Sequence, residues 1–182
     1  MTFDVVLRRK GGSDERHEGM SLPMPGEHNV LNALAAIGAA RELDIGFDAI
    51  RKGFEGFHGV KRRFTRVGEW NGATIIDDYG HHPVEIIATL SGIRQAWPNR
   101  RVIAVFQPHR YSRVADLFSE FCDSFSDADH VVVCPIYAAG EKPIHRINHN
   151  RILDGLLEKG NTSISAIDSL DDAVDHLHAR LN

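Results

Sequence analysis

From residue 65 onward, this sequence alternates short apolar runs rich in β-branched residues with longer stretches of helical periodicity. Strand–helix–strand units cross over with a right hand, so repeating them builds a mostly parallel sheet. The alternation therefore predicts an α/β fold, with a mostly parallel sheet and flanking helices. The expected strands are 65–69, 73–77, 101–106, 130–135 and 163–167, and the expected helices are 83–96, 112–126, 148–159 and 169–181.

The first 64 residues are organised differently. A strand at 3–8 and an extended stretch that runs to Pro25 predict a β-hairpin, and helical spacing predicts helices at 27–43 and 47–54. This part shows no sheet of its own on which the helices could pack, so we expect a piece of a longer protein, divided between residues 64 and 65. A natural small protein with a helical N-terminal subdomain is the alternative.

Composition excludes several classes of function. The net charge of −4 argues against a general nucleic-acid binder, and no apolar run is long enough to span a membrane. Cys122 and Cys134 form no C-x-x-C pair, which is typical of buried thiols in a reducing compartment. We expect a cytoplasmic protein that binds small molecules, without a nucleic-acid or membrane partner.

Two polar runs follow expected strands, at residues 77–83 and 106–113. Ligands of open α/β sheets bind beyond the carboxyl ends of the strands, so we expect both runs to border one site. The first run is rich in carboxylate and imidazole, and the second is rich in guanidinium. The combination suits a substrate that carries charges of both signs.

Arg110 and Arg113 lie three residues apart in the expected first turn of a helix. This spacing places both side chains on one face, and the free N–H groups of the helix end add positive potential. Two guanidinium groups there predict a carboxylate or phosphate site. The alternative is a pair of surface arginines that bridge to Asp116 or Glu120.

His81 and His82 follow Asp77 and Asp78. Adjacent side chains of an extended segment point in opposite directions, so the two imidazoles are poorly placed to share a metal ion, and we expect no metal site. A neutral His81 that orients an amine or accepts its proton is the functional interpretation. His82 is expected to do no more than cap the following helix.

Five further side chains could contact a nucleotide. Asp78 at a strand end could bind ribose hydroxyls, and Tyr79 could stack on a base, although an aspartate here could also bond its own backbone. His28, Asn29 and Asn32 open the first expected helix. Any one of them could be a cap, but three polar side chains in five positions indicate a ligand.

Four segments together resemble the Mur ligases: residues 26–33, 77–85, 106–113 and 136–141. The resemblance runs in order over nearly the whole chain and is strongest to the members that add L-alanine. It implies that residues 1–64 are the C-terminal part of the central, ATP-binding domain. Residues 65–182 would be a truncated, Rossmann-like C-terminal domain that binds the amino acid.

The resemblance also implies an activity. The full-length members that add L-alanine are ATP-dependent carbon–nitrogen ligases of peptidoglycan synthesis, which join L-alanine to UDP-N-acetylmuramate through an acyl phosphate. The cofactors would be ATP and Mg²⁺, with the magnesium ligands in the missing upstream domains, so this piece alone is expected to be inactive. The alternatives are a murein peptide ligase of cell-wall recycling, which tends to carry Phe-Ala where Tyr79-Gly80 stand, and a non-catalytic α/β module that binds an amino acid or anion.

Residue roles follow from the same resemblance. His81 is the expected catalytic residue, and it contacts L-alanine together with Arg110 and Arg113. Ser112 stands where threonine is usual in the family. The expected nucleotide contacts are His28, Asn29, Asn32, Arg63, Asp78 and Tyr79.

Overall fold

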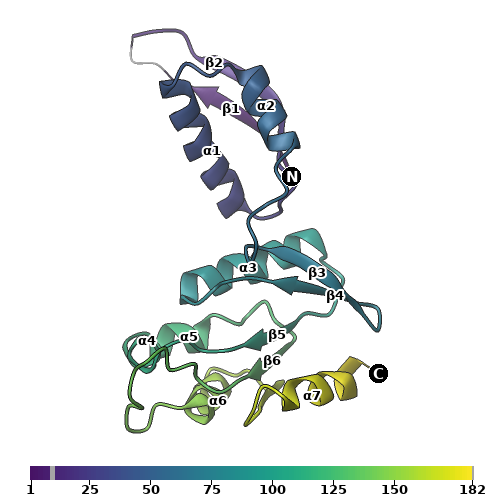
Figure 1. Cartoon of the computed structure of the whole chain (residues 1–182), viewed down its shortest axis with the longest axis vertical. Helices are drawn as coiled ribbons and strands as arrows, with labels where there is room; N and C mark the ends of the chain where they lie inside the picture. Colours follow the sequence, from purple (N-terminus) through teal and green to yellow (C-terminus); the bar gives the residue numbers. More distant parts are fainter. Residues whose placement is uncertain (9–10, 182) are drawn as a thin grey trace.

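The chain folds into two parts joined by a link at residues 56–64 (Figure 1). The structure is a computed structural model that describes residues 1–8 and 11–181. Within these ranges, no helix is both long enough and apolar enough to cross a membrane. Each part has its own apolar core, so the link separates two independently packed units.

The N-terminal part is a β-hairpin covered by two helices. Strands β1 (Thr2–Leu7) and β2 (Glu15–Ser21) pair antiparallel, and helices α1 (Glu27–Glu42) and α2 (Phe47–Glu55) follow, as the sequence predicts. The helices do pack on a sheet, contrary to expectation, because the hairpin itself supplies it. The core of this part consists of Val5, Met20, Ile37, Phe47 and Ile50.

Strands β3 (Thr65–Trp70) and β4 (Ala73–Asp77) form a second antiparallel hairpin. Its two-residue turn is Asn71-Gly72, with φ of 47° and 77°. Positive φ at both turn positions is the type I′ geometry that matches the twist of paired strands. The mostly parallel arrangement is therefore confirmed only for the strands that follow, since this pair runs in opposite directions.

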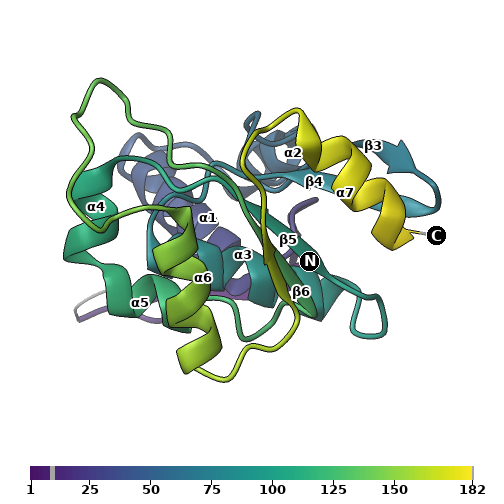
Figure 2. The ribbon, with the colours of Figure 1, turned by 90° about the horizontal axis from the view of Figure 1, so that it is seen from below.

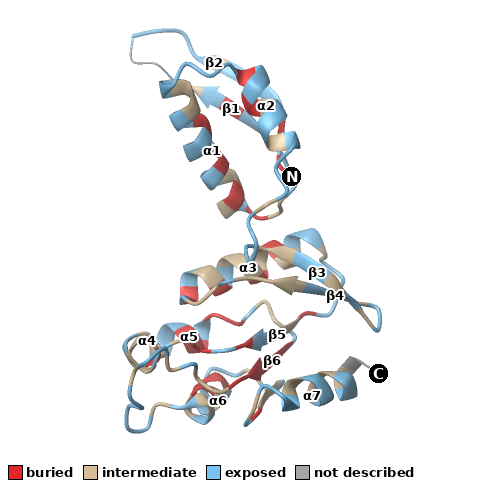
Figure 3. Ribbon diagram, in the orientation of Figure 1, coloured by how far each residue is buried: buried red, intermediate tan, exposed pale blue. Residues whose placement is uncertain are grey.

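The parallel sheet has the order β5 (Ile103–Phe106), β6 (His130–Val133), β7 (Ile164–Ala166). The flanking helices are α3 (Pro83–Ala96), α4 (Tyr111–Asp116), α5 (Phe118–Asp123), α6 (His149–Glu158) and α7 (Asp172–Leu181). All of β6 is buried between the helices (Figure 3), as expected for a strand covered on both faces. The predicted α/β class, with flanking helices, is confirmed.

The helix expected at 112–126 is two helices. The chain leaves helical geometry at Leu117, where φ is −119° and ψ is 29°, between α4 and α5. Val114 of α4 and Phe121 of α5 are both buried in the main core. The change of direction lets two short helices cover the same sheet, which helical periodicity alone does not predict.

Strands β4 and β5 do not pair with each other in the described part of the chain. A cleft of about 530 Å³ lies between them, lined by Ile75 of β4 and Val105 of β5 among others. Arg100, before β5, connects the beginnings of the two strands, because its side chain donates to the carbonyl of Gly72, before β4, over 2.8 Å. Helix α7 lies beside the hairpin tip (Figure 2), with the ring of His178 5.5 Å from that of Trp70.

Gly155 allows α6 to pack closely against α5. A Cβ at this buried position would overlap Cys122 Sγ and would lie 2.7 Å from Phe118 Cζ. Gly155→Ala should therefore lower the free energy of unfolding by about 1–3 kcal/mol, although alanine favours helix. Gly53→Ala in α2 is the matched control, since nothing lies within 4 Å of its Cβ, and it should stabilise by about 0.5–1 kcal/mol. Urea denaturation measures both; equal effects would contradict the close packing.

Candidate active site

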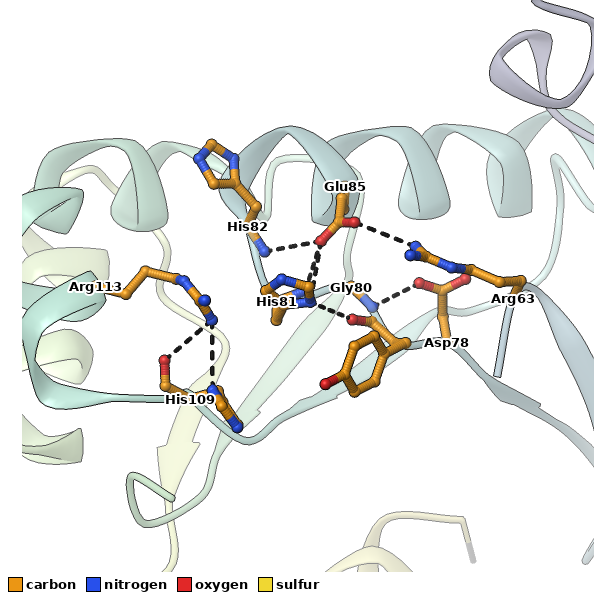
Figure 4. A network of polar contacts seen from close by, with 9 residues as sticks. Arg63, Asp78, Gly80, His81, His82, Glu85, His109 and Arg113 are labelled. Carbon is orange, nitrogen blue, oxygen red and sulfur yellow. Dashed lines mark hydrogen bonds and ion pairs between the residues drawn. The ribbon is translucent and has the colours of Figure 1, made fainter. Parts of the chain in front are cut away.

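The segments that follow β4 and β5 come together at one edge of the domain (Figure 4). His81 follows β4 and His109 follows β5, and their rings lie 6.4 Å apart. Tyr137, beyond β6, lies 5.2 Å from the His109 ring. The two polar runs of the sequence thus border the same space, beyond the carboxyl ends of their strands.

His81 is held in one orientation by its backbone surroundings. Its Nδ1 lies 2.9 Å from the Tyr79 carbonyl oxygen and 3.3 Å from Glu85 Oε2. Because both partners are acceptors, Nδ1 carries a proton, and in the neutral ring Nε2 then keeps a lone pair. The neutral tautomer favoured by this geometry is one in which Nε2 can accept a proton.

His82 and His81 diverge as an extended segment predicts. The His82 ring lies on the opposite side of the loop from His109 (Figure 4), and His82 is the N-cap of α3. Across residues 1–8 and 11–181, no three His, Cys, Asp or Glu side chains gather as a metal site would require.

Arg113 points into the space beside His81. Its Nη1 donates to the His109 carbonyl over 3.3 Å and lies 3.5 Å from His109 Nδ1. In the described ranges the side chain of Arg113 bonds to His109, and neither Arg113 nor Arg110 forms an ion pair with Asp116 or Glu120. The guanidinium groups are therefore not held by the acidic neighbours that the alternative interpretation required.

Arg110 lies outside the helix rather than in its first turn. It is the N-cap of α4, with φ of 73° and ψ of 133°, and its N–H donates to the Tyr137 carbonyl over 2.9 Å. A positive φ is costly for a residue with a Cβ, so the contact with the segment after β6 must hold it. The three-residue spacing did not predict this placement.

The N-terminus of α4 is already occupied by a carboxylate. Glu141 accepts from Ser112 N over 3.0 Å and from Ser112 Oγ over 2.7 Å. These hydrogen bonds, the backbone one first, hold the pKa of Glu141 below its ordinary value. The expectation of free N–H groups at this helix end is therefore wrong at Ser112, because its N–H donates to a carboxylate 29 residues later in the chain.

His109 was not selected from the sequence, yet it lies at the centre of the site. Burial lowers its pKa first, and the charges of Arg113 and Arg110 lower it further. A neutral ring beside two cations can accept a hydrogen bond without adding a third positive charge. Its position in a Pro-His-Arg run after a strand was the only available signal.

A larger cleft of about 930 Å³ lies between the two parts of the chain, and residues of the link form part of its wall. Helix α1 contributes His28, Asn29 and Asn32, and the opposite wall includes Arg63 and Asp78. Asn29 is not a helix cap: its buried side chain donates to the Pro25 carbonyl over 2.6 Å. The structure therefore brings together five of the six predicted nucleotide contacts in one cleft.

Asp78 fastens the link to the loop after β4. Its Oδ2 accepts from Phe64 N over 2.8 Å, and its Oδ1 accepts from Gly80 N over 2.7 Å. Tyr79 does not line the cleft, and the Arg62 guanidinium lies 4.6 Å from its ring centroid. Asp78 is thus partly a turn residue, which is the alternative raised from the sequence. One face of the Tyr79 ring is covered by the Arg62 guanidinium.

Glu85 connects the two regions, and the sequence interpretation gave it no role. It lies in the first turn of α3, lines the 930 Å³ cleft and contacts both Arg63 and His81. Burial raises its pKa, but hydrogen bonds from His81, Arg63 and His82 outweigh burial and leave the pKa lowered. A glutamate three residues after an N-cap was the available signal.

Comparisons with known proteins place these features in context. The family model described as "Mur ligase, glutamate ligase domain" matches residues 62–182. A UDP-N-acetylmuramate–L-alanine ligase from Azorhizobium caulinodans is 56% identical over 166 residues, which is 91% of this chain and 35% of that protein. The chain therefore spans about a third of the length of this curated relative.

Two solved structures are similar in fold. The UDP-N-acetylmuramate–alanine ligase of Thermotoga maritima superposes with a TM-score of 0.70 at 30% identity, over 86% of this chain and 33% of that one. A murein peptide ligase from Psychrobacter arcticus gives 0.62 at 24% identity, over 97% of this chain and 35% of that one. At that identity the second likeness concerns the fold alone.

Proposed function

This chain belongs to the Mur ligase family, and from that premise we propose that it is the C-terminal third of an ATP-dependent ligase. The complete enzyme would join L-alanine to UDP-N-acetylmuramate through an acyl phosphate, in a cytoplasmic step of peptidoglycan synthesis. Residues 1–64 would complete its central domain, and residues 65–182 would form most of its amino-acid-binding domain. Two relatives named UDP-N-acetylmuramate–L-alanine ligase, at 56% and 55% identity, support the choice of substrates.

The convergence of His81 with Arg113 is the observation that carries this proposal. L-Alanine is a zwitterion, so its site needs a cation for the carboxylate and an acceptor for the amine. Arg113 and Arg110 would bind the carboxylate, and His81 Nε2 would face the amine. Holding one end of the substrate in this way aims the other end at the reacting carbon.

The nucleotide belongs in the 930 Å³ cleft, whose volume suits a ligand of that size. Asn32 and His28 offer polar contacts along α1, and Arg63 offers a cation for a phosphate. Asp78 retains lone pairs for ribose hydroxyls beyond its two backbone contacts. Tyr79 could approach the base only on the face that Arg62 leaves open. Mg²⁺ ligands would come from the domains upstream.

The chemistry then divides between the two regions. The muramate carboxylate takes the γ-phosphoryl group of ATP, and the alanine amine attacks the resulting acyl carbon. The new C–N bond forms, the C–O bond to phosphate breaks with its electrons on phosphate, and the amine loses a proton. His81 Nε2 is the group on this chain that would receive the proton.

ADP release from the complete ligase tests the proposal. We expect release that depends on both UDP-N-acetylmuramate and L-alanine. Release that requires a tripeptide in place of L-alanine would identify a murein peptide ligase instead. Absence of ADP release with any amino acid or peptide, together with tight alanine binding by calorimetry, would identify a non-catalytic binding module.

A further inference from the structure

Glu85 lies between the two halves of the proposed site and contacts both (Figure 4). Its Oε2 accepts from His81 N over 3.0 Å and from His82 N over 3.1 Å. Its Oε1 accepts from Arg63 Nη1 over 3.2 Å. One carboxylate thus fixes the loop that carries the catalytic imidazole and also holds a cation of the nucleotide cleft.

The contact with His81 is more than a helix cap. Oε2 lies 3.3 Å from His81 Nδ1, the atom that also donates to the Tyr79 carbonyl over 2.9 Å. Two acceptors on Nδ1 keep the proton there and keep Nε2 directed away from Glu85. The Glu85 carboxylate also lies beside the ring that carries a positive charge once Nε2 has taken a proton.

The contact with Arg63 is exchangeable. Arg63 lies in the link between the two parts, and its side chain is about half exposed, at 47%. Phosphate oxygens accept charge-assisted hydrogen bonds from guanidinium at least as well as a carboxylate does. A phosphate in the cleft would therefore compete with Glu85 for Arg63, and the Glu85 charge would then act on His81 alone.

We propose that Glu85 is a positioning residue that sets the orientation of His81 and couples it to nucleotide binding through Arg63. The inference rests on the proposed function, and it deepens that function by linking the two half-sites. Glu85 touches no reacting atom in this scheme. It makes His81 an effective acceptor once a phosphate has drawn Arg63 away.

Steady-state kinetics of the complete ligase test the proposal with Glu85→Ala and Glu85→Gln. The alanine variant should lose about 10²-fold in kcat, because a misplaced imidazole costs that much, with KM for L-alanine within about twofold. Glutamine keeps an oxygen for the backbone N–H groups but carries no charge, so it should restore thermal stability and only part of kcat. Full kcat in Glu85→Gln would overturn the role of the charge.

The coupling has its own test in the Arg63→Ala background. If Glu85 acts on the nucleotide only through Arg63, then Glu85→Ala should change the KM for ATP in the wild-type enzyme and leave it unchanged in Arg63→Ala. Equal changes in both backgrounds would overturn the coupling.

Glu69→Gln provides the matched control, since Glu69 is an exposed glutamate of β3 paired with Arg66, far along the strand from the site. It should keep full kcat. A loss of kcat in Glu85→Ala that follows only its loss of thermal stability would reduce Glu85 to a helix cap. Failure of the proposed function is distinguishable, because the wild-type enzyme itself would then release no ADP with L-alanine.

Discussion

Replacing Arg113 by alanine in the complete ligase should raise the KM for L-alanine about 10- to 100-fold, while the KM for ATP stays within about twofold. The range corresponds to one charge-assisted hydrogen bond of about 1.5–3 kcal/mol. Arg113 spends Nη1 on the His109 carbonyl, and its remaining N–H groups can meet a carboxylate. Arg113 does not line the 930 Å³ cleft proposed for the nucleotide.

Two further variants separate the guanidinium fork from charge alone. Arg113→Lys keeps a cation without the planar fork, so its KM for L-alanine should fall between wild type and Arg113→Ala. Arg66→Ala removes an exposed arginine that pairs with Glu69, and it should change neither KM. Equal rises in KM for L-alanine and for ATP in Arg113→Ala would contradict a carboxylate site at this position.

Arg110 needs a different substitution, because its backbone is unusual. At φ of 73°, glycine relieves the conformation that arginine adopts at a cost, whereas alanine retains it. Arg110→Gly therefore removes the side chain without adding backbone strain, and any loss of alanine affinity can be assigned to the guanidinium. This choice follows from the structure and not from the Arg110–Arg113 spacing.

Local signals in the sequence predicted most helices and strands, because these elements depend mainly on residues that are neighbours in the chain. Alternating apolar runs located β5, β6 and β7, and Pro83 after a polar turn located the start of α3. The Asn71-Gly72 pair also carried a hairpin signal, which would have indicated the antiparallel turn between β3 and β4. The extended runs of β3 and β4 were identified correctly, but their antiparallel pairing was not predicted.

Contacts between distant residues could not be predicted in the same way. Glu141 occupies the start of α4 from 29 residues away, and Arg110 adopts its positive φ against the Tyr137 carbonyl. Neither contact can be read from the pattern of apolar residues in its own part of the sequence. Glu85 is intermediate: its cap position is readable from the sequence, but its contact with Arg63 depends on how the link folds back.

His81→Gln should lower kcat of the complete ligase about 10²- to 10⁴-fold, the range for loss of a positioned general base. Glutamine can place an amide near the former Nε2 but cannot take a proton at neutral pH. Because the amine then has to lose its proton to solvent, the deficit should shrink as pH rises. The KM for L-alanine should change less than in Arg113→Ala, since the carboxylate contacts remain.

His82→Gln is the internal control for this prediction, because it alters an adjacent imidazole that lies on the opposite side of the loop (Figure 4). Its kcat should stay within about threefold of wild type, since only a helix N-cap is changed. Rates of ADP release at saturating substrates, measured from pH 6 to 9, check both variants. Full kcat in His81→Gln, or an equal loss in His82→Gln, would remove His81 from the reaction and leave Arg113 and Arg110 as a binding site only.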